Sequence, residues 1–157
     1  MLQITRRADY ALIALAHLAT LEGERASVRE LAAAYSLSQP LLANVLKALA
    51  RVELVRSVRG TKGGYELGVA PDALPVGRVL ELFEGPLRLA DCVDDDPDDP
   101  TCAATPCCPV RHGLQRLHQR LRDLLWTTSL ADLARGGRPL PCAAPALSGA
   151  TTGGPPA

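Results

Sequence analysis

The sequence predicts a mainly α-helical fold, in which a winged helix-turn-helix with a two-stranded β wing precedes a long C-terminal helix. Three observations predict it: capped amphipathic helices in the N-terminal third, a glycine-rich turn between two short strands after them, and a leucine repeat at helical spacing further along. A chain of 157 residues is long enough to bury a core of its own, as one compact domain or two small ones.

The N-terminal third predicts three helices. Apolar residues recur at helical spacing over residues 8–21, which indicates a first amphipathic helix. Ser27 and Glu30 have the spacing of a capping box, so a second, short helix should begin there. Ser38 is suited to cap a third helix, and Pro40 is tolerated in its first turn because no intrahelical donor is needed there. Two short helices joined by a tight connection match the helix-turn-helix pattern.

The third helix is expected to have two different faces. Its apolar stripe, which should be buried, consists of Leu42, Val45, Leu46 and Leu49. The opposite side carries Gln39, Asn44, Lys47 and Arg51. Arg, Lys, Gln and Asn are the side chains that read base edges in the major groove of DNA. This helix is therefore the candidate reading helix.

A β-hairpin should follow, with strands near residues 54–58 and 65–67 on either side of a glycine-rich turn. The turn contains Arg59, Gly60 and Lys62, which form a small positive tip able to approach phosphates or enter a narrow minor groove. The order of helix, helix-turn-helix and hairpin predicts that residues 1–70 form a DNA-binding winged helix.

The rest of the chain divides by composition. Residues 71–90 should contain a connecting helix, residues 91–109 a cysteine-rich loop, and residues 110–134 a single helix. Residues 135–157 are rich in Pro, Gly and Ala and are expected to be a disordered tail. The helix predicted over residues 110–134 has a coiled-coil-like seam, made of Leu114, Leu117, Leu121 and Leu124. Because a seam of this length is not stable alone, we expect it to pack against its copy in a homodimer.

Five cysteines are present, and four of them lie close together: Cys92, Cys102, Cys107 and Cys108. Cys142 lies in the tail and is expected to take no part. In a reducing compartment such clusters favour metal binding or redox chemistry over structural disulfides. The spacing suits an iron–sulfur cluster, a zinc site or a thiol switch, and does not choose among them.

The histidines are less informative than the cysteines. His17 interrupts an apolar helix and is expected at the edge of the core. His118 lies one step from the leucine seam and is expected on the surface. His112 follows Cys108 closely enough to be a possible metal ligand.

Charge and hydropathy narrow the classes of function. Residues 1–70 carry nine Lys and Arg against six Asp and Glu, whereas residues 71–110 carry two against nine. The longest apolar stretch is too short to span a bilayer, and no signal peptide is apparent, so a cytoplasmic protein with no membrane association is expected. Neither a catalytic triad nor a phosphate-binding glycine loop nor paired catalytic carboxylates stand out, which argues against an enzyme.

Three motifs in order resemble a known family: residues 1–12, the hairpin of residues 58–65 and the later cysteine cluster. They resemble the IscR/NsrR (Rrf-type) family of bacterial winged-helix, iron–sulfur-sensing transcription regulators, over residues 1 to about 134. The resemblance implies a homodimeric repressor that binds a double-stranded DNA operator. It also implies control by a cysteine-ligated 2Fe-2S or 4Fe-4S cluster that senses iron–sulfur status, nitric oxide or redox state.

The resemblance implies particular ligands for the cluster. By position the three thiolates would be Cys92, Cys102 and Cys108, with Cys107 as an alternative to Cys108. One branch of the family uses an aspartate of the first helix as the fourth ligand, which matches Asp9 of the partner subunit. Another branch uses a histidine, for which His112 is one residue too far along. Some members keep no cluster, which leaves a cluster-free regulator using zinc or a thiol switch as the alternative.

The resemblance also implies the DNA contacts. Arg59 would enter the minor groove, and the start of the third helix would face the major groove. The residues expected at DNA are Ser38, Gln39, Asn44, Lys47, Arg59, Gly60 and Lys62.

Overall fold

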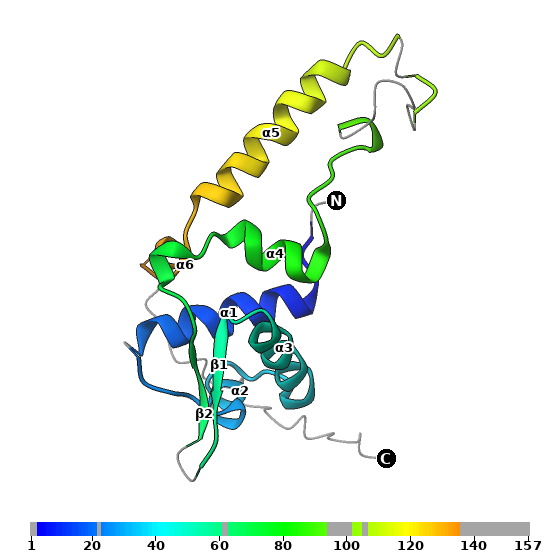
Figure 1. The fold of residues 1–157 in the computed structure, drawn as a ribbon. Helices are drawn as coiled ribbons and strands as arrows, with labels where there is room; N and C mark the ends of the chain where they lie inside the picture. The colour runs from blue at the N-terminus through cyan, green and yellow to red at the C-terminus, as the bar shows by residue number, and fades with distance from the viewer. Residues whose placement is uncertain (1–2, 22, 61–62, 94–101, 105–106, 136–157) are drawn as a thin grey trace, which may run out of the picture.

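The computed structural model describes residues 3–21, 23–60, 63–93, 102–104 and 107–135 (Figure 1). The elements in chain order are α1 (Arg6–Thr20), α2 (Val28–Tyr35), α3 (Gln39–Arg51), β1 (Val55–Val58), β2 (Gly64–Leu67), the 3-10 turn η1 (Pro71–Ala73), α4 (Val76–Glu84), the 3-10 turn η2 (Asp91–Val93), α5 (Arg111–Thr127) and α6 (Leu130–Arg135). The predicted fold class is confirmed: the described residues are mainly helical, with one antiparallel two-stranded sheet.

The second helix begins at the predicted cap, whereas the first begins two residues earlier than predicted and ends one residue earlier. The Ser27 and Glu30 capping box is formed: the Ser27 N–H donates to the Glu30 carboxylate at 2.7 Å, and the Glu30 N–H donates to the Ser27 hydroxyl at 3.2 Å. At its other end α2 stops because Ser36 adopts the left-handed conformation, with φ of 54°. Helix α1 begins at an N-cap residue, Thr5, whose hydroxyl accepts from the Ala8 N–H.

The prediction that the Ser38 side chain caps α3 is wrong. Ser38 occupies the N-cap position, but its hydroxyl makes no capping hydrogen bond. An N-cap side chain bonds the N–H of the second or third helical residue. The second, Pro40, has no N–H, and the Ser38 hydroxyl does not bond the N–H of the third, Leu41, either. The Ser38 backbone N–H instead donates to the hydroxyl of Tyr10 on α1 at 3.3 Å.

One hydrophobic core lies between α1, α3 and the hairpin, and includes fully buried leucines such as Leu15, Leu46 and Leu54. Leu74 and Leu130, from the chain that follows the hairpin, belong to the same core. In Figure 1, α4 lies along α1, and α5 extends away from this body. The core therefore ties α6 and the start of α4 to the winged helix.

The leucine-rich helix is shorter than predicted. Instead of one helix over residues 110–134, α5 ends at Thr127 and a separate α6 begins at Leu130. Ser129 and Asp132 form a capping arrangement that starts α6, in which the Ser129 N–H donates to the Asp132 carboxylate at 3.0 Å and the Asp132 N–H to the Ser129 hydroxyl at 3.1 Å. The leucine repeat of α5 ends at Leu124, and Thr128 stands at its next position.

The surface position expected for His118 is also wrong, because only 6% of this residue is exposed. Helix α5 contacts both α4 and η2, so part of its surface is covered within the chain. Among the described residues, no helix combines the length and the apolar character needed to cross a membrane.

Candidate DNA-binding surface and cysteine loop

Helix α3 separates its apolar and polar residues as the sequence predicts. Its buried residues are Leu42, Val45, Leu46 and Leu49. The predicted DNA-contacting residues of the helix are all exposed: Ser38, Gln39, Asn44 and Lys47. Arg51, in the last turn, is exposed as well. Because the buried stripe fixes the rotation of the helix, these polar side chains are held toward solvent.

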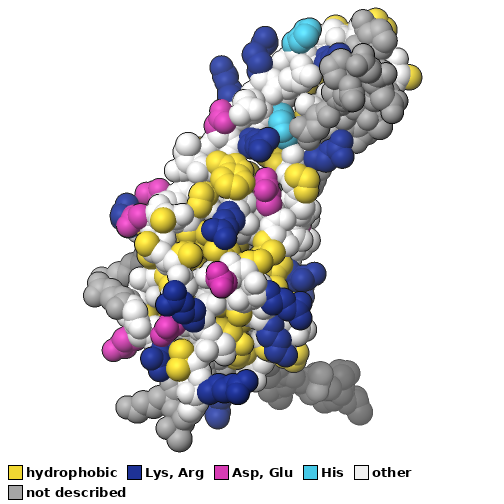
Figure 2. Space-filling model, viewed as in Figure 1, with side chains coloured by type: hydrophobic (Ala, Val, Ile, Leu, Met, Phe, Trp, Pro, Cys, Tyr) yellow, Lys and Arg dark blue, Asp and Glu magenta, His cyan; other side chains and the backbone are white. Residues whose placement is uncertain are grey.

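The wing lies beside α3 and presents basic side chains. β1 and β2 pair in antiparallel register from Val55↔Leu67 to Val58↔Gly64, and Arg56 and Arg59 are exposed. Gly60 has φ of 127°, a conformation that residues with a Cβ rarely adopt, so the turn depends on glycine there. Lys62 lies outside the described residues. Figure 2 shows Lys and Arg side chains gathered over the lower part of the molecule, where α3 and the hairpin lie.

Two contacts that the sequence did not predict hold the wing against the helices. Ala26 and Tyr65 form an isolated antiparallel bridge, with reciprocal N–H to carbonyl hydrogen bonds of 3.1 and 2.9 Å. Next to it, the Arg25 guanidinium lies 3.0 Å from the Glu66 carboxylate. The segment before α2 thus behaves as a third strand at one point, which fixes the orientation of the hairpin.

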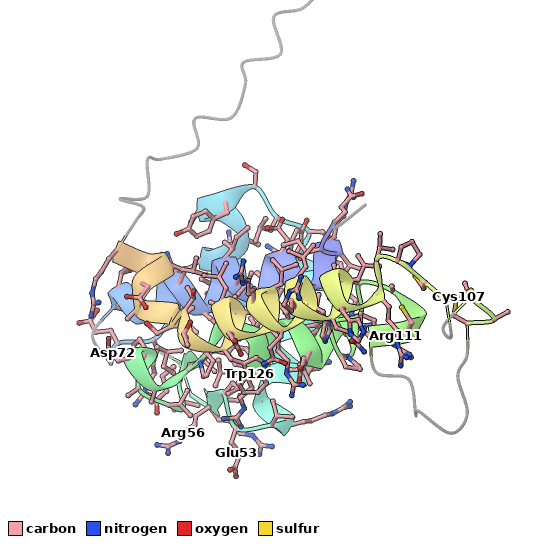
Figure 3. The ribbon with its side chains drawn as sticks, turned by 90° about the horizontal axis from the view of Figure 1, so that it is seen from above. Glu53, Arg56, Asp72, Cys107, Arg111 and Trp126 are labelled. Carbon is pink, nitrogen blue, oxygen red and sulfur yellow. The ribbon has the colours of Figure 1, made fainter. Side chains whose placement is uncertain are left out.

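The cysteines occupy the connection between α4 and α5. Cys92 lies in η2 and is buried, Cys102 and Cys108 are partly exposed, and Cys107 is exposed. Cys107 lies beyond the N-terminal end of α5, at the opposite end of the molecule from Asp72 (Figure 3). All four are free thiols. Cys142 lies outside the described residues.

The described residues do not bring the predicted ligands together. Among them, no group of three or more His, Cys, Asp or Glu side chains is placed to hold a metal ion. Asp9, near the start of α1, and His112, in the first turn of α5, are both exposed. The donor set still suits an iron–sulfur cluster chemically, because soft thiolates are its usual ligands and these thiols are not consumed by disulfides.

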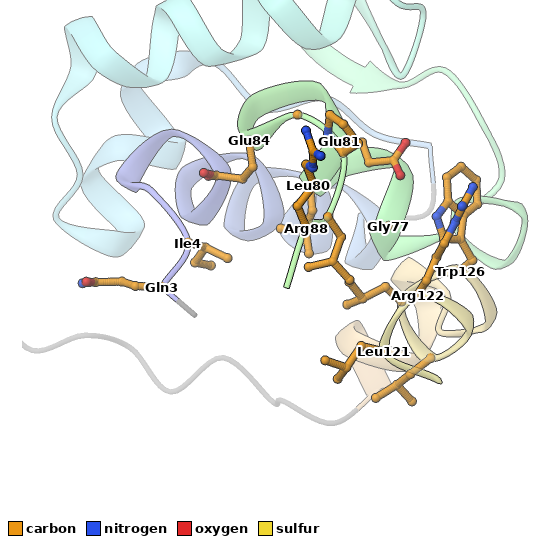
Figure 4. Close-up of a pocket in the computed structure, with 15 residues that line it drawn as sticks. Gln3, Ile4, Gly77, Leu80, Glu81, Glu84, Arg88, Leu121, Arg122 and Trp126 are labelled. Carbon is orange, nitrogen blue, oxygen red and sulfur yellow. The ribbon is translucent and has the colours of Figure 1, made fainter. Parts of the chain in front are cut away.

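A groove of about 440 Å³ lies between the N-terminal arm, α4 and α5. Its walls are mainly apolar and include Ile4, Leu80, Leu121 and Trp126 (Figure 4). The neighbouring seam of α5 is open to solvent: Leu117 is 49% exposed and Leu124 58%. So large an apolar surface, on a helix that extends from the core, is typical of a surface that packs against another chain.

A further polar contact, missed by the sequence analysis, connects α1 with the end of α4. Glu84, the last residue of α4, accepts two hydrogen bonds from Thr5: from its N–H at 2.9 Å and from its hydroxyl at 2.7 Å. These two bonds, the hydroxyl first, lower the pKa of the Glu84 carboxyl, and the charge of Arg7 adds to the effect. The Arg7 guanidinium lies 5.5 Å from the centre of the Phe83 ring. No short motif signals a contact between residues 79 positions apart.

A helix-turn-helix flanked by a basic hairpin defines a winged-helix protein, with the exposed face of α3 beside the wing. Within that class, the chain belongs to the Rrf2 family, described as an iron-dependent transcriptional regulator, whose model matches residues 4–136. It is thus a transcription regulator of this family, and the resemblance found in the sequence is confirmed.

Solved structures of the same family are similar along nearly the whole chain. The global cysteine regulator CymR of B. subtilis has a TM-score of 0.70 and 29% identity, covering 88% of this chain and all of that one. CymR of Staphylococcus aureus, in an oxidized form, has a TM-score of 0.63 and 30% identity, covering 85% and 96%. T. potens IscR has a TM-score of 0.63 and 26% identity, covering 86% and 88%.

Proposed function

We propose that the protein is a homodimeric repressor that binds a double-stranded DNA operator, controlled by its cysteine loop. One observation carries the DNA-binding part: the exposed polar face of α3 lies beside the basic wing. Gln39 and Asn44 would face the bases in the major groove, Lys47 would contact the phosphate backbone beside them, and Arg59 would enter the adjacent minor groove.

The dimer would form through α5. Leu117 and Leu124 of its seam are exposed, and Leu121 and Leu124 also line the apolar groove against α4. A second copy of α5, packed along this seam, would cover both and would place two reading helices on one DNA molecule. Two-fold symmetry of this kind calls for an operator with two half-sites.

The cysteine loop would carry the signal. The thiolates of Cys92, Cys102 and Cys108 (or Cys107) would hold an iron–sulfur cluster, and Asp9 of the partner subunit or His112 would complete it. Such a cluster supplies a group that is lost or altered by oxidants, nitric oxide or iron shortage. The loop joins α4 to α5, so its conformation bears on both the core and the dimer seam.

A second candidate, a thiol switch without a cluster, is favoured by the exposed thiol of Cys107 and by the likeness to CymR, a cysteine regulator described in an oxidized form. Two thiols of the loop would be oxidised to a disulfide by hydrogen peroxide, which is reduced to two molecules of water. Zinc bound by the same thiols would be a related alternative.

The test is the iron, sulfide and zinc content of protein purified without oxygen, with its visible spectrum. Iron and sulfide in near-equal amounts, lost in Cys92→Ser, Cys102→Ser or Cys108→Ser and kept in Cys142→Ser, would support the cluster. Colourless protein that forms an intramolecular disulfide with peroxide would support the thiol switch, and zinc in place of iron would support a zinc site.

DNA binding is tested separately with duplexes selected by the protein from a random pool. Arg59→Ala should weaken binding and relax selectivity at A·T-rich flanks, where a narrow minor groove attracts arginine. Arg116→Ala, an exposed arginine of α5, is the matched control. Equal affinity of the wild type and Arg59→Ala would remove the wing from the DNA interface.

A further inference from the structure

Two polar contacts, with three hydrogen bonds in all, connect the beginning of α1 with two functionally different parts of the molecule. On one side Thr5 donates twice to Glu84, at the C-terminal end of α4. On the other side the hydroxyl of Tyr10 accepts from the backbone N–H of Ser38, at the start of α3. Both contacts join residues far apart in the sequence.

The Glu84 contact lies where the cysteine loop begins. Gly85 ends α4 with φ of 79°, and the chain then runs directly to η2, which contains the buried Cys92. Glu84 is therefore the residue of α4 that is nearest in the chain to the cysteine loop. Through its two bonds, Glu84 then acts on the N-cap of α1.

The Tyr10 contact lies where the reading helix begins. Ser38 makes no side-chain cap, and its backbone N–H donates to the Tyr10 hydroxyl, which connects α1 to the N-cap of α3. Gln39, the first residue of α3, is one of the expected DNA contacts. A displacement of Tyr10 would therefore move the part of α3 that faces the bases.

The segment between the two contacts is a single stretch of closely packed helix. Thr5 and Tyr10 are separated by about one and a half helical turns, or about 7.5 Å along the axis. Ala8 and Ala11 in this stretch are fully buried, and the helix contacts α3, α4 and α6. A close-packed helix moves as a body, so a shift at Thr5 is carried to Tyr10.

We infer that Glu84, Thr5 and Tyr10 are positioning residues that transmit the state of the cysteine loop to the reading helix through α1. This inference rests on the proposed function, because it concerns how the same loop would control DNA binding. It assigns a role to polar contacts that neither ligate a metal nor touch DNA.

The direct test is amide NMR of the DNA-free protein, read at Ser38. Tyr10→Phe removes only the hydroxyl and should accelerate hydrogen exchange of the Ser38 amide about tenfold, the factor that loss of one hydrogen bond corresponds to. Glu84→Ala and Thr5→Val remove the distant contact and should accelerate the same amide roughly threefold. Glu84→Gln keeps an oxygen that can accept both bonds, and should restore the wild-type rate.

Two matched controls distinguish transmission from general loosening. Thr20→Val removes a hydroxyl that bonds only within the last turn of α1, and Tyr35→Phe removes a tyrosine hydroxyl between α1 and α2. Neither should change the Ser38 amide. A Ser38 amide that responds to Tyr10→Phe but not to Glu84→Ala would overturn the inference, as would an equal response to Thr20→Val.

A second measurement separates this inference from the proposed function. The affinity for a selected duplex is measured for four proteins. They are the wild type, Cys92→Ser, which perturbs the loop, Glu84→Ala, and the variant that carries both substitutions. The transmission is supported if Cys92→Ser changes the DNA affinity of the wild type but does not change the DNA affinity of Glu84→Ala. If Cys92→Ser does not change the DNA affinity of the wild type, control by the loop is refuted. The exchange rate of the Ser38 amide would still decide whether the Glu84 and Tyr10 contacts are coupled.

Discussion

His17 on α1 and Tyr35 on α2 are joined by a hydrogen bond of 2.9 Å between the imidazole Nδ1 and the tyrosine hydroxyl. Their rings meet edge to face, with centroids 5.5 Å apart and planes at 89°. The histidine interrupts an otherwise apolar helix, and this contact explains how it is accommodated at the edge of the core, as the sequence predicted.

The partial burial of His17 predicts a pH dependence of stability. Burial lowers the pKa of His17, so the folded protein keeps it neutral where the unfolded chain, with an ordinary value of about 6.5, already binds a proton. Stability should therefore fall as pH decreases from about 6.5 through the lowered pKa, and gain nothing from this group above that window. His17→Gln should flatten the Tm profile between about pH 7.5 and pH 5, and the exposed His112→Gln should not. Parallel profiles for the wild type and His17→Gln would contradict the prediction.

Two glycines in helices should respond in opposite ways to alanine. A Cβ at Gly77 on α4 would lie 3.0 Å from the Trp126 ring and 3.2 Å from the Leu125 carbonyl, whereas one at Gly113 on α5 would meet nothing within 4 Å. Overpacking costs about 1–3 kcal/mol, and alanine gains up to about 1 kcal/mol of helix propensity. Gly77→Ala should therefore lower the free energy of unfolding by roughly 1 kcal/mol, and Gly113→Ala should raise it slightly. Urea titrations measure both, and stabilisation by Gly77→Ala would show that Trp126 moves freely.

The dimer seam can be tested with one charged substitution. Leu124→Glu places a carboxylate in the exposed seam of α5, where a second copy would have to bury it. We expect a folded monomer at micromolar concentration in sedimentation equilibrium. Leu133→Glu, at a 43% exposed leucine of α6, should remain a dimer. If sedimentation gave the two variants the same molecular mass in solution, the dimer interface would not lie at the α5 seam.

Lys47 should contribute to DNA affinity through phosphate. Its side chain is exposed on α3, between the expected base contacts and the C-terminal end of the helix. Lys47→Ala should weaken binding to all sequences alike and reduce the slope of log K against log salt by about 1. A wild-type slope in the variant would place Lys47 away from the DNA backbone.

Much of the fold could be predicted because it depends on local signals. The capping box at Ser27, the apolar stripe of α3 and the glycine-rich turn each act over a few residues, so spacing revealed them. Two local predictions failed. The Ser38 side chain does not cap α3, although Ser38 occupies the N-cap position, and a second helix start at Ser129 lies inside the segment predicted as one helix.

The candidate site was predicted by residue type but not by its connections. Exposure of Gln39, Asn44 and Lys47 follows from helical period, and the structure agrees. The contact of Thr5 with Glu84 depends on how α4 folds back over α1, which no pattern of neighbouring residues encodes. The burial of His118 has the same origin, because it depends on which elements cover α5.

Trp126 is the only tryptophan of the chain, and it lies over Gly77 in the groove that Glu84 also lines. Its indole is 40% exposed, so anything that enters or leaves the groove changes the polarity around it. The protein thus carries an intrinsic fluorophore at the junction of α4 and α5. Its emission maximum would report assembly and loop rearrangement in real time, without any attached dye.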